Sequence, residues 1–159
     1  MRPRQGGLEP LRELTKECVD MAHVVQHALH EVCAPAVQEK LAEVSYRYRR
    51  IVSELTGALT ATSASTEAEE IKVSYGAKDR CEWISLLHRV DTDRPYQVIK
   101  TIFVLHERLV TRLEKLLDDR HTLPASVKKV FLRQRESLQV SSTVLTRALR
   151  DQQPAEFVA

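Results

Sequence analysis

Apolar residues recur at alternating intervals of three and four positions in four long stretches of the sequence. This spacing places them along one side of an α-helix and is typical of helices whose apolar sides pack together. Pro35, Pro95 and Pro124 stand where the second, third and fourth stretches begin, and the first turn of a helix tolerates proline. The pattern predicts helices over about 8–33, 35–60, 93–118 and 124–151. The expected fold class is therefore all-α, a four-helix bundle.

Each predicted helix has one row of core positions, which we call its seam. Polar residues interrupt the seams in the second, third and fourth helices, and a cysteine does so in the first. The seams are Leu11, Leu14, Cys18, Met21, Val25, Ala28 and Val32; Val37, Leu41, Val44, Tyr48, Ile51, Leu55 and Ala58; Ile99, Ile102, His106, Leu109, Leu113 and Leu116; and Val127, Phe131, Gln134, Leu138, Ser141, Leu145 and Ala148.

The long connection between the second and third helices differs in composition from the rest of the chain. It begins with small and hydroxyl-bearing residues over 61–66, and Trp83 lies in an apolar stretch that predicts a short extra helix over about 79–89. A helix of about 26 residues is roughly 39 Å long, a distance that about 30 residues can cover. A parallel crossover is therefore feasible. We expect one domain over 8–151, with a disordered 1–7 and a flexible 152–159.

Composition narrows the classes of function. Lys and Arg total 24 against 22 for Asp and Glu, a balance that predicts no nucleic-acid binding, and the patch around Arg47, Arg49 and Arg50 is typical of a charged helix face. No stretch is apolar enough to cross a membrane or to act as a leader. Three cysteines without a C-x-x-C pair favour a reducing cytoplasm and leave their redox role undecided; they are Cys18, Cys33 and Cys81.

Three histidines of the first helix form the densest group of possible metal ligands. His23 and His27 have the i, i+4 spacing that lets two imidazoles share a metal, and His30 follows. At 100° per residue, however, the three lie about 120 to 180° from Cys18 on the helix, opposite the seam. The sequence therefore predicts a solvated polar face or an interaction face rather than a metal centre inside the bundle.

His106 occupies a seam position near the middle of the third helix, and Tyr48 lies near the middle of the second. We predict a hydrogen bond between them, within a buried polar layer that also holds Cys18, Gln134 and Ser141, provided that these side chains satisfy one another. The plain interpretation is a core histidine that fixes helix register. A dinuclear metal site would need inward carboxylates and E-x-x-H motifs, and Glu107 is followed by Arg, Leu and Val. Phosphotransfer would need an exposed imidazole.

Several short motifs carry a resemblance to known proteins: Leu11-Arg-Glu-Leu-Thr-Lys-Glu-Cys18, Ser53-Glu-Leu55, Trp83, Leu123-Pro124, Arg133-Gln134 and Leu149-Arg-Asp151. In these motifs the chain resembles a family of bacterial proteins of unknown function with a ferritin-like, rubrerythrin-related four-helix bundle. The resemblance extends from about Leu8 to Asp151. Where such proteins carry inward metal ligands, this chain has Ala22, Arg47, His106 and Ser142, so the resemblance implies that a dinuclear centre has been lost, although Glu43, Glu54 and Glu107 lie within a turn.

These observations predict a non-enzymatic ferritin-like bundle with no catalytic residue and no cofactor, which acts through self-association or a protein partner. A homodimer could form through exposed seams, and the face with His23, His27 and His30 is a candidate surface. The first alternative is a redox or ferroxidase-type protein that binds iron or another divalent metal, with His106, Glu107, His23 and His27 as possible ligands. The second is a histidine phosphotransfer bundle.

Overall fold

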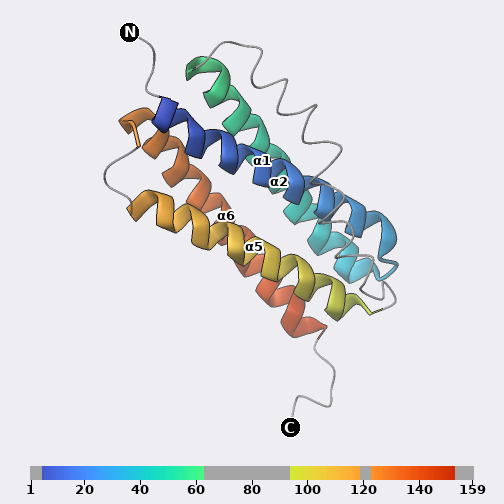
Figure 1. Ribbon diagram of the computed structural model, residues 1–159. Coiled ribbons are helices and arrows are strands. Elements are labelled where there is room, and N and C mark those ends of the chain that lie inside the picture. Colours follow the sequence, from blue (N-terminus) through green and yellow to red (C-terminus); the bar gives the residue numbers. More distant parts are fainter. Residues whose placement is uncertain (1–4, 63–93, 119–122, 153–159) are drawn as a thin grey trace.

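The computed structural model describes residues 5–62, 94–118 and 123–152, and it is built from the four predicted helices (Figure 1). They are α1 (Gln5–Glu31), α2 (Pro35–Thr62), α5 (Pro95–Asp118) and α6 (Ala125–Asp151). The described residues contain no strand. The four-helix prediction is confirmed, with bounds that differ from the predicted ones by no more than three residues. The predicted helix over 79–89 lies outside the described residues, as do 1–4 of the predicted disordered 1–7 and 153–159 of the predicted flexible 152–159; residues 5–7 belong to α1.

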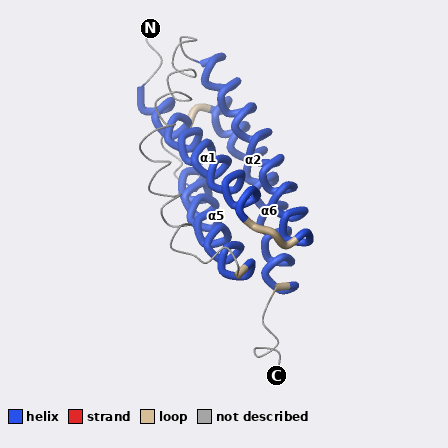
Figure 2. The backbone as a smooth tube through the Cα atoms, turned by 90° about the vertical axis from the view of Figure 1, so that its right-hand side faces the viewer, coloured by secondary structure: helices blue, strands red, loops and turns tan. Residues whose placement is uncertain are grey.

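The helices form a bundle in which every packed pair is antiparallel. α1 packs against α2 and α5, and α6 packs against the same two helices. α2 and α5 lie at opposite corners of the bundle. Figure 1 shows that these two helices run in the same direction, while α1 and α6 run in the opposite direction. α2 therefore ends at the opposite end of the bundle from the start of α5. This parallel arrangement of α2 and α5 agrees with the crossover that the sequence makes feasible, whereas α1 and α2 are joined by a short loop (Figure 2).

The seams meet in one continuous core. Almost every predicted seam residue is buried; the exceptions are Ala58 and Leu116, which are half-buried while Leu59 and Leu117 beside them point inward. Burying a leucine, isoleucine or valine side chain contributes roughly 1.5–3 kcal/mol each, so these rows supply most of the driving force for the fold. Because the seams face one another, they are buried within the single chain. None of the described helices is both long and apolar enough to cross a membrane.

The turn between α1 and α2 is fixed by polar contacts at the end of α1. The amide of Val32 donates to the carbonyl of Ala28 over 3.0 Å, which continues the α1 hydrogen bonding by one residue. Gln38, in the first turn of α2, donates its side-chain amide to the carbonyl of Val32 over 2.6 Å. Pro35 begins α2, where its missing N–H costs nothing. The Val32 carbonyl at the end of α1 thus accepts a hydrogen bond from the first turn of α2.

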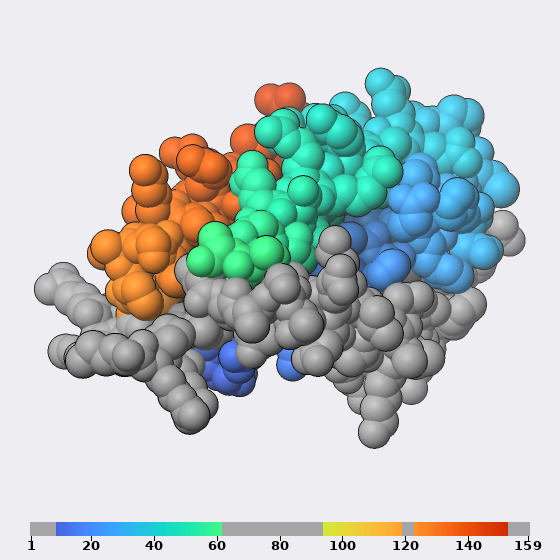
Figure 3. Space-filling view, turned by 90° about the horizontal axis from the view of Figure 1, so that it is seen from above, coloured from blue at the N-terminus to red at the C-terminus, as the bar shows by residue number. Residues whose placement is uncertain are grey.

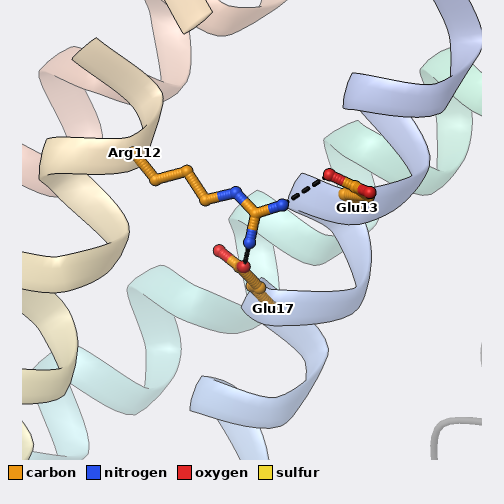
Figure 4. A network of polar contacts seen from close by, with 3 residues as sticks. All are labelled: Glu13, Glu17 and Arg112. Carbon is orange, nitrogen blue, oxygen red and sulfur yellow. Dashed lines mark hydrogen bonds and ion pairs between the residues drawn. The ribbon is translucent and has the colours of Figure 1, made fainter. Parts of the chain in front are cut away.

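A charged contact joins α1 to α5 on the bundle surface. Arg112 of α5 places its two terminal nitrogens on two carboxylates of α1, those of Glu13 and Glu17 (Figure 4). The two glutamates are four residues apart and so lie on the same side of α1. The arginine and Glu13 are each more than 40% exposed, and Glu17 is 21% exposed. Solvent screening therefore limits the energy of this contact.

We expect the substitution Arg112→Ala to lower the free energy of unfolding by no more than about 1 kcal/mol, because exposed ion pairs rarely contribute more. Urea denaturation in low salt and in 1 M NaCl measures the effect, and most of it should disappear at high salt. Arg108→Ala, an exposed position one turn away on α5, is the matched control. A loss of 3 kcal/mol in Arg112→Ala alone would show that the contact is a principal determinant of the fold.

Candidate functional site

A hydrogen-bonded chain of side chains crosses the core between α2, α5 and α6. The Tyr48 hydroxyl lies 2.5 Å from Nδ1 of His106, and both residues are fully buried. Their rings meet edge to face, with centroids 5.7 Å apart. The predicted hydrogen bond between these two residues is confirmed. Tyr48 and His106 belong to the seams of α2 and α5. Each residue lies near the middle of its helix, so the two side chains reach the same level of the bundle.

The other nitrogen of His106 fixes the direction of this chain. Nε2 lies 3.0 Å from the carbonyl oxygen of Leu138, which can only accept, and 2.8 Å from the hydroxyl of Ser142. Nε2 therefore carries the proton of the neutral ring, and the Tyr48 hydroxyl donates to Nδ1. Ser142 in turn reaches a carboxylate oxygen of Glu107 over 3.2 Å. A continuous path runs from the buried phenol to a half-buried carboxylate.

Burial favours the neutral form of three buried side chains, those of Tyr48, His106 and Cys18. Desolvation is the main reason why the pKa of Tyr48 is raised well above its ordinary value, and repulsion between a phenolate and the anionic forms of Cys18 and Glu107 adds to it. Burial lowers the pKa of His106, although its bond to the Leu138 carbonyl and the charge of Glu107 oppose this shift. Burial also raises the pKa of the Cys18 thiol. Near neutral pH these groups act as hydrogen-bonding or packing elements rather than as charges.

The predicted polar layer is only partly correct. Gln134 and Ser141 are buried as predicted, but neither bonds to Tyr48 or His106. Gln134 instead donates to a carboxylate oxygen of Glu54 over 2.6 Å, and the Ser141 hydroxyl has no hydrogen-bond partner among the described residues. Ser142, the next residue along α6, completes the chain because its side chain turns toward α5 rather than toward the centre of the core. Sequence reasoning missed its role because Ser142 lies beside the seam rather than in it.

The two neighbouring serines of α6 provide a matched test of this network. Ser141→Ala is expected to raise the free energy of unfolding by about 1 kcal/mol, because it removes a buried hydroxyl that lacks a partner. Ser142→Ala is expected to lower it by about 1 kcal/mol, since it removes the hydroxyl that contacts both His106 and Glu107. Urea denaturation at pH 7.5 measures both. Equal effects of the two substitutions would contradict the assignment of Ser142 to the chain.

A groove runs along the outer surface between α2 and α6, which lie side by side in the space-filling view (Figure 3). Its volume is about 540 Å³. The Gln134–Glu54 hydrogen bond joins the two helices within it, so the order of residues along each antiparallel helix gives their order along the groove. The lining residues are Glu43, Tyr46, Arg47, Arg50, Ile51, Glu54, Arg133, Gln134, Glu136, Ser137 and Val140.

The charges of this α2–α6 groove are only partly paired. Arg47 lies 3.6 Å from Glu43 on the same helix. Arg50, Arg133 and Glu136 form no ion pair with any residue that the structure describes. In the same groove, Oε1 of Gln134 and Nε of Arg47 are buried without hydrogen-bond partners in the part of the chain that the structure describes. Buried polar atoms without a hydrogen-bond partner are costly. These two atoms of the groove could therefore still form hydrogen bonds with a bound molecule.

Two exposed apolar side chains lie at one end of the groove. Tyr46 is 55% exposed and Val140 is 42% exposed, although both are large and apolar. Tyr46 and Tyr48 are two positions apart on α2 and so point in different directions, one toward solvent and the other into the core. Tyrosine and arginine, which both line this groove, are enriched in protein interfaces relative to the rest of the surface. The sequence alone assigned the arginines of α2 to a charged face and did not connect them with α6.

The histidine face of α1 is less open than predicted. His30 is exposed and lies 2.9 Å from the side-chain nitrogen of Gln26. His23 and His27 are half-buried, and neither is without an interaction. Across residues 5–62, 94–118 and 123–152, no three His, Cys, Asp or Glu side chains come together as a group that could hold a metal ion. Of the two cysteines described, Cys18 is buried and Cys33 is exposed, and both are free thiols; Cys81 lies outside the described residues.

Comparison of the chain with protein-family models, with curated proteins and with solved structures gives no match.

Proposed function

We propose that this protein is a non-enzymatic, ferritin-like helical bundle that acts by association, either with a protein partner or with a second copy of itself. The observation that carries the proposal is the α2–α6 groove, in which exposed apolar side chains lie beside arginines that have no carboxylate partner among the described residues. The parallel crossover between α2 and α5 supports the ferritin-like part, because that type of bundle has one such connection. A reducing cytoplasm is the proposed location.

The burial of the core chain favours association over chemistry in the core. Tyr48 and His106 are 0% exposed, and their hydrogen bonds are made to groups of the bundle itself. A substrate could reach them only if the helices separated. The network is better suited to fixing which helices meet, and in what register, than to turning over a substrate. The solvent-facing groups with spare bonding capacity are those of the groove.

The same observations weigh on the two alternatives. Phosphotransfer on His106 would require an imidazole that a kinase domain can reach, and this one is enclosed by three helices. A ferritin-type metal centre would require several inward carboxylates. Glu54 and Glu107 are both half-buried, but each is hydrogen-bonded to a residue of α6, and the two do not share a partner in these bonds. The groove therefore remains the site that the geometry favours.

Quantitative mass spectrometry of co-purifying proteins tests the proposal. The wild-type protein, expressed at its native level, is compared with the double variant Tyr46→Glu/Val140→Glu, which places two carboxylates on the apolar end of the groove. We expect at least one protein, or a second copy of the chain, to be recovered with the wild type and to be reduced at least tenfold with the variant.

The matched control is Val104→Glu, which introduces a carboxylate at a 43% exposed apolar position of α5 outside the groove. This variant should recover the same protein as the wild type. Circular dichroism establishes that all three are folded. If every co-purifying protein is recovered equally with the wild type and the groove variant, the proposed function is wrong.

A further inference from the structure

The hydrogen bonds that lead from Tyr48 to Glu107 all donate in one direction. The Tyr48 hydroxyl donates to Nδ1 of His106 over 2.5 Å. Because Nε2 of the neutral ring carries the proton, it donates to the Ser142 hydroxyl over 2.8 Å. Ser142 donates to a carboxylate oxygen of Glu107 over 3.2 Å. These four residues form a proton path, in which each proton faces an acceptor at a distance suited to proton transfer.

The proton path ends at a carboxylate that can take up a proton. The Ser142 hydroxyl has one proton and two acceptors, the Leu138 carbonyl at 3.1 Å and the Glu107 carboxylate at 3.2 Å. The charged oxygen is the stronger acceptor of the two. Glu107 is half-buried and forms no ion pair with any residue that the structure describes. No neighbouring cation among those residues therefore holds this carboxylate in its charged form.

From this geometry we propose that Tyr48 is a redox-active residue. It gives one electron to a one-electron oxidant of high potential outside the bundle, and its O–H bond breaks as the proton moves to Nδ1 of His106. The Nε2 proton passes to Ser142, and the Ser142 proton passes to Glu107. One electron has then left the chain, Tyr48 is a neutral phenoxyl radical, and Glu107 is a neutral carboxylic acid. A one-electron donor restores the phenol when the protons move back.

This reaction is separate from association through the α2–α6 groove and does not depend on it. Burial, which keeps substrates away from the core, favours it. A phenoxyl radical is neutral, so it places no charge at Tyr48, which is 0% exposed. Burial raises the pKa of Tyr48 well above its ordinary value, so the proton leaves together with the electron and not alone. Burial also lowers the pKa of His106, so Nδ1 is unprotonated and can accept.

An electron needs no opening between the helices. α2 lies at the surface of the bundle, and the exposed Arg49 follows Tyr48 in the chain. A helix with its side chains is about 10–12 Å across, so an oxidant on the outer side of α2 comes within about that distance of the Tyr48 ring. The closed core also keeps other molecules away from the radical, so two phenoxyl radicals in different bundles cannot couple.

Tyr46 is the natural comparison for Tyr48. It lies two positions away on the same helix and is 55% exposed, so an oxidant in solution reaches it more easily. Its hydroxyl forms no hydrogen bond with any residue in the described ranges. Oxidation of Tyr46 therefore has no base of the described chain to take the proton. A long-lived radical should form on the buried tyrosine and not on the exposed one.

Flash photolysis of the full chain tests this assignment. Photo-excited tris(bipyridine)ruthenium(II) and a cobalt(III) quencher generate ruthenium(III), a one-electron oxidant, and the tyrosyl radical is followed by its absorption and its EPR signal. The wild-type radical should outlast that of N-acetyltyrosinamide at least tenfold. It should be lost in Tyr48→Phe and retained in Tyr46→Phe. A long-lived radical that survives in Tyr48→Phe, equal losses in the two variants, or no long-lived radical in the wild type would overturn the proposal.

Variants along the proton path separate proton transfer from packing. His106→Gln should lower the rate of radical formation at least tenfold, and it should remove the slowing that the wild type shows in deuterium oxide. Ser142→Ala and Glu107→Gln should each lower the rate at least threefold. The matched controls are Ser141→Ala, at the buried neighbour of Ser142, and Glu114→Gln, at a half-buried position of α5, and both should stay within twofold of the wild type.

Circular dichroism establishes which of these variants are folded. If His106→Gln is unfolded, Ser142→Ala and Glu107→Gln decide, because they change side chains that are only half-buried. An unchanged rate in folded His106→Gln, or equal rates in Ser142→Ala and Ser141→Ala, would overturn the proposal.

Discussion

Replacing His106 with alanine is expected to lower the free energy of unfolding by about 3–5 kcal/mol. The substitution leaves a cavity in the middle of the bundle, and large-to-small changes in a core cost about 2–5 kcal/mol on their own. It also removes the acceptor of the Tyr48 hydroxyl and the donor to Ser142. A buried hydroxyl left without a partner costs a further 1–3 kcal/mol, part of which relaxation of the core will recover.

A double-mutant cycle with Tyr48→Phe isolates the hydrogen bond from the cavity. In the wild-type background Tyr48→Phe should cost about 1–3 kcal/mol, because Nδ1 of His106 then lacks its donor. In the His106→Ala background the same change should cost nothing or stabilise the fold, since the hydroxyl it removes is already without a partner. Urea denaturation of the four proteins gives the coupling energy. Strictly additive effects would show that the 2.5 Å contact contributes nothing to the stability of the fold.

Acid should destabilise the bundle below about pH 6.5, and His106 is the reason. Burial lowers the pKa of this histidine in the folded state, so the unfolded chain binds a proton more readily than the folded one in this range. The contribution to stability is fully present above the unfolded pKa of about 6.5 and is lost as the pH falls toward the folded value. One such group lowers the free energy of unfolding by at most about 1.4 kcal/mol per pH unit.

Free energies of unfolding measured in urea at half-unit steps from pH 7.5 to 5.0 test this dependence. The groups that face His106 are Tyr48 of α2 and Glu107 of its own helix, with the Leu138 carbonyl and the Ser142 hydroxyl of α6. The tyrosine stays protonated throughout, so the slope over the upper part of the range belongs to histidines. In the His106→Gln variant the slope of the free energy of unfolding against pH should flatten. In the His30→Gln variant, which changes an exposed position, the slope should be unchanged. An unchanged slope in His106→Gln would contradict the assignment.

The helices and most of the core could be predicted from the sequence because burial follows spacing. A row of apolar residues at intervals of three and four has one face to bury, and the chain buries it. The Tyr48–His106 contact followed from the same spacing, since two polar residues at mid-helix in facing seams have few other partners. Ser142 did not, because it lies beside its seam, and spacing says which face of a helix is buried but not where a side chain at the edge of that face points.

The groove could not be predicted because it depends on which helices are neighbours. Arg50 and Arg133 are 83 positions apart in the sequence, and they line the same groove only because α2 packs against α6. The order of helices along the chain allows other neighbours for α2, and a bundle with a different diagonal would separate these arginines. For the same reason, the half-burial of His23 and His27 could not be derived from the phase of α1 alone.

Photo-crosslinking in living cells tests most directly whether the groove is where this protein makes its contacts. A photoreactive amino acid is introduced at Val140, which lines the groove, and separately at Gln139, an exposed neighbour on α6 that does not. Illumination should give a covalent adduct with one other protein, or with a second copy of the chain, from position 140 and not from position 139, and Tyr46→Glu should abolish it. Adducts that form equally from both positions, or none from position 140, would contradict a function in association through the α2–α6 groove.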